Sequence, residues 1–302
     1  MPSSPLHAPV LDWYETHARE LPWRAPDASP WAVLVSEVML QQTPVARVLP
    51  VYLAWLERWP TPAALAADSP GNAVRMWGRL GYPRRALRLH AAAGAVTAHH
   101  GGQVPSSYAD LLALPGVGSY TAAAVASFAF GGRHAVLDTN VRRVLARSVA
   151  GAEHPAPHLS TAERASADSV VPDDAAAAAR WAVAVMELGA LVCTARDPRC
   201  GDCPVADRCS WRAAGRPRYD GPRRRPQGFA GTDRQVRGLI MAALRESGGP
   251  VPVASLEPLC SDADQRERAL AGLIEDGLAV QQPDGRLTLP GSAAVPPAAA
   301  RG

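Results

Sequence analysis

The feature that most constrains this chain is a run of four cysteines within seventeen residues. Cys193, Cys200, Cys203 and Cys209 are spaced C-x6-C-x2-C-x5-C. Thiolate ligands select zinc or an iron–sulfur cluster. Structural zinc sites usually pair two short C-x2-C hooks, whereas the wide first gap here suits a loop that closes around a larger object. The spacing therefore favours one [4Fe–4S] cluster, with structural zinc as the alternative.

The rest of the composition is that of an ordinary globular chain. Apolar residues make up 47% and charged residues 20% of the 302 positions, and this length allows two or three packed units. The start, MPSSPLHAPVLDWY, has no charged region of the kind that opens a secretion signal. No run of about 20 apolar residues follows it. We therefore expect a soluble protein of the cytoplasm.

Every basic side chain is an arginine. The 31 basic residues include no lysine, so no ε-amine is available to form a Schiff base with a sugar aldehyde. The net charge of +3 is uneven, because residues 232–290 carry −3 while residues 212–225 hold six arginines and one aspartate. Such a basic stretch is either a solvated linker or a segment that follows a phosphate backbone. The sequence leaves both open.

Apolar residues recur at helical spacing through the first 210 residues, where alternating strand patterns are absent. Breaks that contain Pro or Gly separate the helical segments. The predicted helices span residues 10–19, 31–42, 44–58, 84–100, 108–114, 121–130, 141–150 and 175–192. The pattern predicts a mainly all-α fold.

The composition shifts to Arg, Pro and Gly over residues 213–231, which indicates a linker. Beyond it the patterns predict three helices and a β-hairpin with a Pro-Asp-Gly turn, at residues 232–247, 253–260, 262–276 and 278–289. Three helices followed by a hairpin are typical of a small winged-helix-like unit. The Ala- and Pro-rich tail, residues 291–302, is expected to be disordered.

The segment LPGVGSYT, residues 114–121, places two glycines around an apolar residue between two helical segments. Such a turn exposes backbone N–H groups at a helix N-terminus, where they can bind a phosphate without a charged side chain. A GxG between helices is by itself most often only a turn. The preceding Leu-Pro and the small-residue helix that follows favour a helix-hairpin-helix DNA element.

Two carboxyl groups stand out by their surroundings. Glu37 lies inside the apolar helix WAVLVSEVML, where desolvation should raise its pKa and favour the protonated form. Asp138 begins a helix in LDTNVRR, where the helix dipole and nearby N–H groups should keep it ionised. A buried ion pair would also explain Glu37, and a simple N-cap would explain Asp138. One protonated and one ionised carboxyl are, however, what cleavage of a glycosidic bond through an oxocarbenium-like state requires.

The ordered motifs LDWY, LPWR, SEVMLQQT, GRLGY, LPGVGSYTA, LDTNVRRVL, MELGALVC and the four cysteines resemble the adenine DNA glycosylase (MutY) family over residues 11–211. That family belongs to the helix-hairpin-helix, iron–sulfur superfamily that also contains endonuclease III. The resemblance implies a monofunctional N-glycosylase of base excision repair, which flips mispaired adenine out of the duplex and removes it. Its implied partner is double-stranded DNA with adenine opposite 8-oxoguanine or guanine. A monomer associated with the bacterial nucleoid is implied as well.

The resemblance implies a catalytic role for four residues. Glu37 falls on the general acid that protonates N7 of adenine, and Asp138 falls on the carboxylate that stabilises the sugar cation. Asn140 aligns with an asparagine that supports this aspartate. Tyr120 occupies the position of the Schiff-base lysine in the lyase branch and is expected to position the intermediate. The implied base pocket consists of Arg19, Trp23, Arg24, Leu40 and Met186.

DNA contacts are implied for further motif residues. Gln42 and Tyr82 are expected to wedge into the base stack around the orphaned purine, and the amides of the glycine turn are expected to hold a phosphate. The complete implied set is Gln41, Gln42, Thr43, Leu80, Tyr82, Gly116, Val117, Gly118, Ser119 and Arg142.

The resemblance also divides the chain into domains. It implies a six-helix barrel with the helix-hairpin-helix element and a cluster domain that includes the N-terminal helix. The expected divisions are residues 1–25 with 135–212 for the cluster domain, 26–134 for the barrel, 213–231 for the basic linker, 232–290 for the winged-helix-like unit and 291–302 for the tail.

Three departures from the family pattern matter. Pro83 stands where the family commonly has a second tyrosine, and Val183 stands where many relatives place Glu or Gln near the adenine. Residues 232–290 are too few for the large C-terminal domain that reads 8-oxoguanine in many relatives. Their predicted recognition helix is more acidic than basic, so we expect this unit to serve packing or protein contacts rather than to read the major groove.

Three alternative functions stay open. Tyr120 and the absence of lysine count against an endonuclease III-like pyrimidine glycosylase-lyase. A mismatch thymine or uracil glycosylase also has a tyrosine at that position, and Glu37 is the residue that argues for a purine. An iron–sulfur DNA-binding regulator would leave Glu37 and Asp138 without a role.

Overall fold

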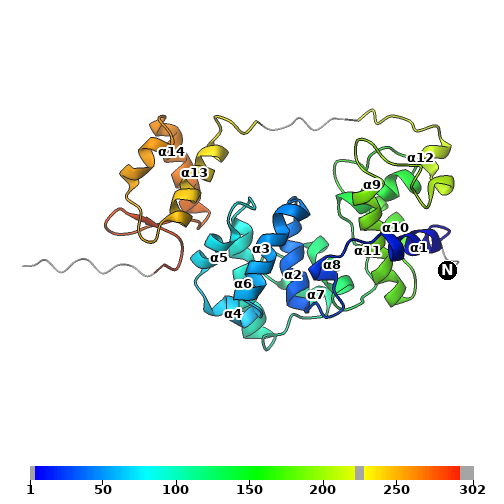
Figure 1. Cartoon of the computed structure of the whole chain (residues 1–302), viewed down its shortest axis with the longest axis horizontal. Coiled ribbons are helices and arrows are strands. Elements are labelled where there is room, and N and C mark those ends of the chain that lie inside the picture. The colour runs from blue at the N-terminus through cyan, green and yellow to red at the C-terminus, as the bar shows by residue number, and fades with distance from the viewer. Residues whose placement is uncertain (1–3, 222–227, 293–302) are drawn as a thin grey trace, which may run out of the picture. The chain divides into compact units, whose positions relative to one another are not determined.

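The computed structural model describes residues 4–221 and 228–292 (Figure 1). Apart from one two-stranded sheet, the regular elements of these residues are helical. The α-helices are α1 His7–His17, α2 Pro30–Leu40, α3 Val45–Arg58, α4 Pro62–Ala67, α5 Pro70–Trp77, α6 Arg84–His99, α7 Tyr108–Ala113, α8 Ser119–Phe128, α9 Thr139–Ser148, α10 Thr161–Ser169, α11 Ala175–Leu191, α12 Ser210–Ala213, α13 Asp233–Glu246 and α14 Ala263–Glu275. The 3-10 helices are η1 Pro22–Arg24, η2 Ala206–Arg208 and η3 Val253–Leu259, and the strands are β1 Val280–Gln281 and β2 Leu287–Thr288.

Each helix predicted in the first 210 residues has a counterpart, and the structure adds three that hydrophobic periodicity missed: α4, α5 and α10. They are short, so few apolar positions repeat, but their starts carry N-terminal signals. The side chains of Thr61, Ser69 and Ser160 each accept a hydrogen bond from the backbone N–H three residues later. Proline follows the cap in α4 and α5. Capping chemistry therefore identifies these helices better than periodicity does.

The predicted helix at residues 253–260 is wrong in type, because the structure has the 3-10 helix η3 there. Pro258 lies inside this segment, and a proline lacks the N–H that a continuing α-helix needs. The hairpin is present but short: Val280 pairs with Thr288 and Gln281 with Leu287 in antiparallel register. An isolated bridge from Val251 to Leu287 ties the hairpin to the start of η3.

Contacts divide the chain into two compact units. The first compact unit comprises Met1–Glu37, Pro105–Ala113 and Val117–Arg223, and the second comprises Val38–Val104, Leu114–Gly116 and Arg224–Gly302. The motif-based domain divisions stay a prediction. Parts of the predicted linker and tail, residues 222–227 and 293–302, lie outside the described residues. No helix among the described residues is long and apolar enough to cross a membrane.

Helix α11 forms the centre of the first compact unit. Its Trp181, Val185 and Leu188 are buried against α1 and against Val141 and Val144 of α9. Burying a side chain of this size contributes about 1.5–3 kcal/mol, so this contact fixes α9 firmly on α11. The packing determines the positions of the N-cap of α9, Asp138, and of the C-terminal end of α11.

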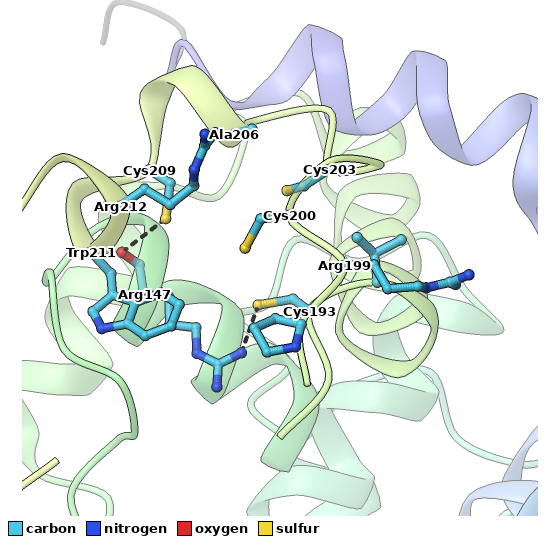
Figure 2. A pocket seen from close by; sticks show the side chains of 11 residues that line it. Arg147, Cys193, Arg199, Cys200, Cys203, Ala206, Cys209, Trp211 and Arg212 are labelled. Carbon is cyan, nitrogen blue, oxygen red and sulfur yellow. Dashed lines mark hydrogen bonds between the residues drawn. The ribbon is translucent and has the colours of Figure 1, made fainter. Parts of the chain in front are cut away.

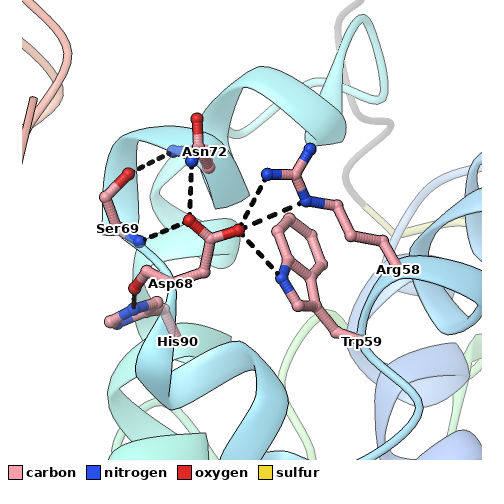
Figure 3. Close-up of polar contacts among 6 residues, drawn as sticks. All are labelled: Arg58, Trp59, Asp68, Ser69, Asn72 and His90. Carbon is pink, nitrogen blue, oxygen red and sulfur yellow. Dashed lines mark hydrogen bonds and ion pairs between the residues drawn. The ribbon is translucent and has the colours of Figure 1, made fainter.

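In the second compact unit, Trp55 lies edge-on to both Trp59 and Trp77, with ring centroids 4.6 and 5.6 Å apart. Beside them Asp68 joins α3 to the start of α5, because its carboxylate accepts hydrogen bonds from Arg58, the Trp59 indole, Ser69 N–H and Asn72 (Figure 3). Burial acts to raise the pKa of Asp68, but hydrogen bonds from Asn72 and Arg58 outweigh it and lower the pKa to about 2. This network is a structural junction.

Candidate active site and iron–sulfur centre

Glu37 is a buried carboxyl group without an ion pair among the described residues. Glu37 lies on α2 and is only 4% exposed. Its Oε2 accepts a 2.7 Å hydrogen bond from the Tyr120 hydroxyl. Burial raises the pKa of Glu37 to about 7; the Tyr120 hydrogen bond opposes this shift, and the Asp138 charge adds to it. Near neutral pH this side chain is therefore poised between an acid and a carboxylate.

Asp138 caps the N-terminus of α9. Its two oxygens accept hydrogen bonds from Val141 N–H, at 2.6 Å, and from the Asn140 amide, at 2.7 Å. That Asp138 is ionised near neutral pH stays a prediction. Burial is the largest influence and raises the pKa of Asp138, whereas the hydrogen bonds from Val141 and Asn140 act to lower it. These donors fix the orientation of the carboxylate.

Tyr120 lies in the first turn of α8 and is a neutral hydrogen-bond donor. Burial, followed by the charges of Glu37 and Asp138, raises the pKa of its hydroxyl well above the usual value of 10. The ring also packs against the apolar cluster formed by Ala123, Val136 and Ala182. The structure thus places Tyr120 and Glu37 in hydrogen-bond contact, and Asp138 near enough for its charge to act on both.

Glu187 is a buried carboxyl group for which the sequence predicted no role. Its carboxylate is fully buried on α11 and accepts hydrogen bonds from Arg19 Nε and Nη2, at 2.7 and 2.8 Å, while Arg24 Nη1 lies 3.0 Å from it. Burial raises the pKa of Glu187, but the Arg19 hydrogen bond and the Arg24 charge outweigh it and hold the pKa below its usual value. A glutamate within the apolar run WAVAVMELGAL is the same signal that identified Glu37.

A chain of hydrogen bonds links the Asp138 carboxylate to Cys193, the first of the four cysteines. Asn140 donates to Asp138 and accepts from Arg143 Nη2 at 2.9 Å, and Arg143 Nε donates to the Cys193 carbonyl at 2.7 Å. Arg143 also donates to the Gly189 carbonyl at 2.6 Å. A Cβ on Gly189 would come within 2.8 Å of Asn140, so only glycine allows α9 and α11 to approach this closely. Gly189 and Arg143 lie within the motifs MELGALVC and LDTNVRRVL, but no role was predicted for either.

The four cysteines surround one pocket, and Figure 2 shows their sulfur atoms turned toward a common space. Arg147 donates to Cys193 Sγ at 3.4 Å and lies over the Trp211 ring, 4.8 Å from its centroid. Soft thiolates with a cationic donor directed at the sulfur suit an iron–sulfur cluster. The donor set therefore fits the predicted cofactor.

Two loops of the second compact unit carry the expected wedge residues. Gln42 and Tyr82 both have positive φ, +57° and +48°, which is strained for non-glycine residues and a frequent mark of functional loops. The buried Arg85 guanidinium donates hydrogen bonds to both loops. It donates to the Gln41 carbonyl at 2.7 Å, to Thr43 Oγ1 at 3.1 Å and to the Gly81 carbonyl at 3.1 Å. Arg85 is another residue for which the motifs predicted no role.

In the glycine turn, Gly116 has φ +75° and approaches α6 closely, since a Cβ there would lie 2.5 Å from that of Arg88. Gly118 precedes α8 and leaves the first N–H groups of that helix without a side-chain cap. A phosphate site at this turn stays a prediction. Arg142, by contrast, is paired with Glu163 at 2.5 Å, so a phosphate contact there would require that pair to open.

The remaining predicted residues take varied positions. Trp23 is buried in η1, and Met186 packs between the two apolar clusters of the first compact unit. Leu40 follows Glu37 by one helical turn on α2. Thr43 and Leu80 are buried, and Ser119 is exposed.

Comparison with known proteins defines the class. Residues 35–167 match the HhH-GPD superfamily of base excision DNA repair proteins, and residues 193–209 match the iron–sulfur binding domain of endonuclease III. The chain is therefore a mainly helical glycosylase-fold protein with an iron–sulfur domain, and its four cysteines are the predicted ligands. The predicted fold class and cofactor are confirmed.

The particular family follows from whole-chain relatives. The chain is 51% identical over 284 residues to adenine DNA glycosylase of Mycobacterium tuberculosis, a match that covers 93% of this chain and 92% of that protein. It is 43% identical over 209 residues to the human adenine DNA glycosylase, covering 66% of this chain and 38% of that one. A solved thermostable thymine-DNA glycosylase is similar over 68% of this chain and 94% of its own, at 27% identity and a TM-score of 0.61. The chain belongs to the adenine DNA glycosylase family, as its motifs predicted.

Proposed function

We propose that this protein hydrolyses the N-glycosidic bond of adenine mispaired with 8-oxoguanine or guanine in double-stranded DNA. The observation that carries the proposal is the buried Glu37, whose pKa is raised to about 7, in electrostatic contact with a second oriented carboxyl group, Asp138. The named adenine glycosylases support the choice of base. The protein acts as a monomer on DNA in base excision repair.

In this mechanism Glu37 gives its proton to N7 of the flipped adenine. The bond from C1′ to N9 breaks, its electron pair leaves with the base, and a positive charge develops on the sugar. The Asp138 carboxylate stabilises that charge, and water then adds to C1′ and loses a proton. A negative charge on Asp138 makes ionisation of the nearby Glu37 less favourable, and the reverse also holds. The state with Asp138 ionised and Glu37 protonated is therefore favoured over the state with both groups ionised.

The surrounding residues orient these groups. Asn140 and Val141 N–H hold the Asp138 carboxylate, and Tyr120 holds Glu37. Arg19, Trp23, Arg24, Leu40 and Met186 form the base pocket in this proposal, with Glu187 fixing the two arginines. When bound, the iron–sulfur cluster ties residues 193–209 into one loop beside Arg143.

We further propose that the enzyme is monofunctional and leaves an intact abasic site. Strand cleavage by β-elimination needs an amine that traps the ring-opened sugar as an imine. The chain contains no lysine, and Tyr120 offers only a hydroxyl with a raised pKa. Borohydride should therefore trap little covalent complex.

The test is a single-turnover assay on duplexes with one labelled base. Adenine opposite 8-oxoguanine and adenine opposite guanine should both release free adenine, and strand breaks should need hot alkali. Thymine opposite guanine, the substrate suggested by the name of the similar thymine glycosylase, should stay intact. Release of thymine but not adenine would contradict the proposed base. Efficient cleavage without alkali would contradict the monofunctional assignment.

A further inference from the structure

The C-terminal residues of the second compact unit dock at a defined place on α5. Arg75 of α5 donates to the carbonyls of Arg245 and Ser247, at 2.7 and 2.9 Å, and so caps the C-terminus of α13. A Cβ on Gly71 would come within 2.5 Å of the Pro290 carbonyl oxygen, so the chain after β2 also lies close against α5. This two-point attachment places α13 beside the loop that carries Tyr82.

A salt bridge ties the same unit to the far side of that loop. Arg84 and Asp276 are 3.0 Å apart, and Asp276 also pairs with Arg237 of α13. Because the attachment joins guanidinium groups to backbone carbonyls and to a carboxylate on both sides of residues 78–84, the docked position is specific rather than a loose contact.

At this junction one guanidinium lies over two exposed aromatic rings. The Arg234 carbon Cζ is 5.8 Å from the Tyr82 ring centroid and 5.6 Å from the Phe229 ring centroid. Tyr82 is 54% and Phe229 is 53% exposed, whereas large aromatic side chains are more often buried. Within residues 4–221 and 228–292 Arg234 forms no ion pair; the neighbouring Asp233 is held by Gln265 and Arg268.

Aromatic rings that contact a guanidinium by their faces limit its rotation and leave its N–H donors at the edge. Those donors match the oxygens of a phosphodiester in geometry and charge. Residues 232–290 carry a net charge of −3, so the unit as a whole does not attract DNA. An arginine without an ion pair at this position therefore points to a local contact.

We propose that Arg234, held by Tyr82 and Phe229, binds a backbone phosphate of the DNA beside the loop that carries Tyr82. This inference rests on the proposed function for the identity of the duplex. It gives the C-terminal unit a DNA-binding role that uses the start of α13 rather than a recognition helix in the major groove.

The test uses the full-length protein with its cluster and a duplex carrying a non-cleavable abasic analogue opposite guanine. Affinity is measured by fluorescence anisotropy between about 50 and 200 mM KCl, because each lost phosphate contact reduces the slope of log K against log salt by about 0.9. Arg234→Ala should reduce the slope by about that amount. The matched control is Arg286→Ala, an equal charge change at an exposed turn of the same unit, which should leave the slope unchanged.

A third variant tests the docking without a change of charge. Gly71→Leu should push residues 289–290 off α5 and reduce the slope as Arg234→Ala does. An unchanged slope in Arg234→Ala, or an equal reduction in Arg286→Ala, would overturn the proposal, and an unchanged slope in Gly71→Leu would overturn its dependence on docking. Release of adenine by the unmodified protein tests the proposed function separately, since the salt slope requires only DNA binding.

Discussion

Two glutamates of the first compact unit lie in nearly the same environment and end in opposite states. Glu37 on α2 and Glu187 on α11 are both buried within apolar helices. Glu187 is held by two arginines, and its pKa is lowered, whereas Glu37 has a neutral phenol as its hydrogen-bond partner and a pKa of about 7. Burial therefore sets the size of the possible shift, and the partner decides its sign.

The two sites are also connected. Arg24 acts to lower the pKa of Glu37, and the same arginine is paired with Glu187. Glu187 thus offsets part of a positive charge that would otherwise favour the ionised form of Glu37. The comparison assigns proton transfer to one glutamate and the support of two pocket arginines to the other.

The largest expected effect is on catalysis at Glu37. Glu37→Gln removes the proton donor, and a positioned general acid contributes about 10²–10⁴-fold to a rate. Single-turnover release of adenine should fall by at least this factor, and Asp138→Asn should have a similar effect because it removes the stabilising charge. Duplex affinity and the thermal unfolding curve serve as controls. A rate within tenfold of the unmodified protein would break the assignment.

The converse is expected at Glu187. Glu187→Gln leaves two arginines near the pocket without a full counter-charge, and disruption of a buried ion pair costs about 3–5 kcal/mol. The partial exposure of Arg19, whose side chain is 36% exposed, favours the lower end of this range. Urea unfolding should show the loss, whereas Glu37→Gln should lose no stability near neutral pH, because it removes a carboxyl group whose burial disfavours the ionised form. Equal stability of the two variants would contradict the different roles assigned to Glu187 and Glu37.

The pH dependence of stability should differ in sign between the sites. Unfolded chains release the Glu37 proton near pH 4.5, but the native protein keeps it to about 7, so the unfolded state binds fewer protons in this window and stability falls as pH rises. The change is on the order of 3 kcal/mol. It should be present in the unmodified protein and absent in Glu37→Gln. Glu187 contributes in the opposite sense, since its stabilisation is present above pH 4.5 and is lost as pH falls through its lowered native pKa.

The smallest expected effect is at Tyr120. Its hydroxyl donates to Glu37 and favours the ionised form, so Tyr120→Phe should move the pKa of Glu37 upward. The pH at which the excision rate begins to fall should rise by a fraction of a unit. A shift to lower pH would show that the phenol acts in another way.

Much of this site could be predicted because its chemistry depends on residue types at fixed spacing. Each of three features can be recognised from its own short motif: the cysteine run, the glutamate within SEVMLQQT and the aspartate that caps α9. Arg85, Arg143 and Glu187 were not predicted, because their roles depend on distant partners that packing brings together: Arg85 contacts Gly81 and residues 38–43, and Glu187 contacts Arg19 and Arg24. The upward shift in the pKa of Asp138 was not predicted for the same reason, since a motif shows the cap but not the burial.

The most direct test of the central claim is the pH profile of single-turnover adenine release by the unmodified protein. If Glu37 is the acid, the rate should fall about tenfold per pH unit above a midpoint near 7, the pKa that its burial produces. The rate should also fall at low pH, where Asp138 becomes protonated. A rate that stays constant or rises from about pH 6 to pH 9 would contradict acid catalysis by a buried, protonated Glu37.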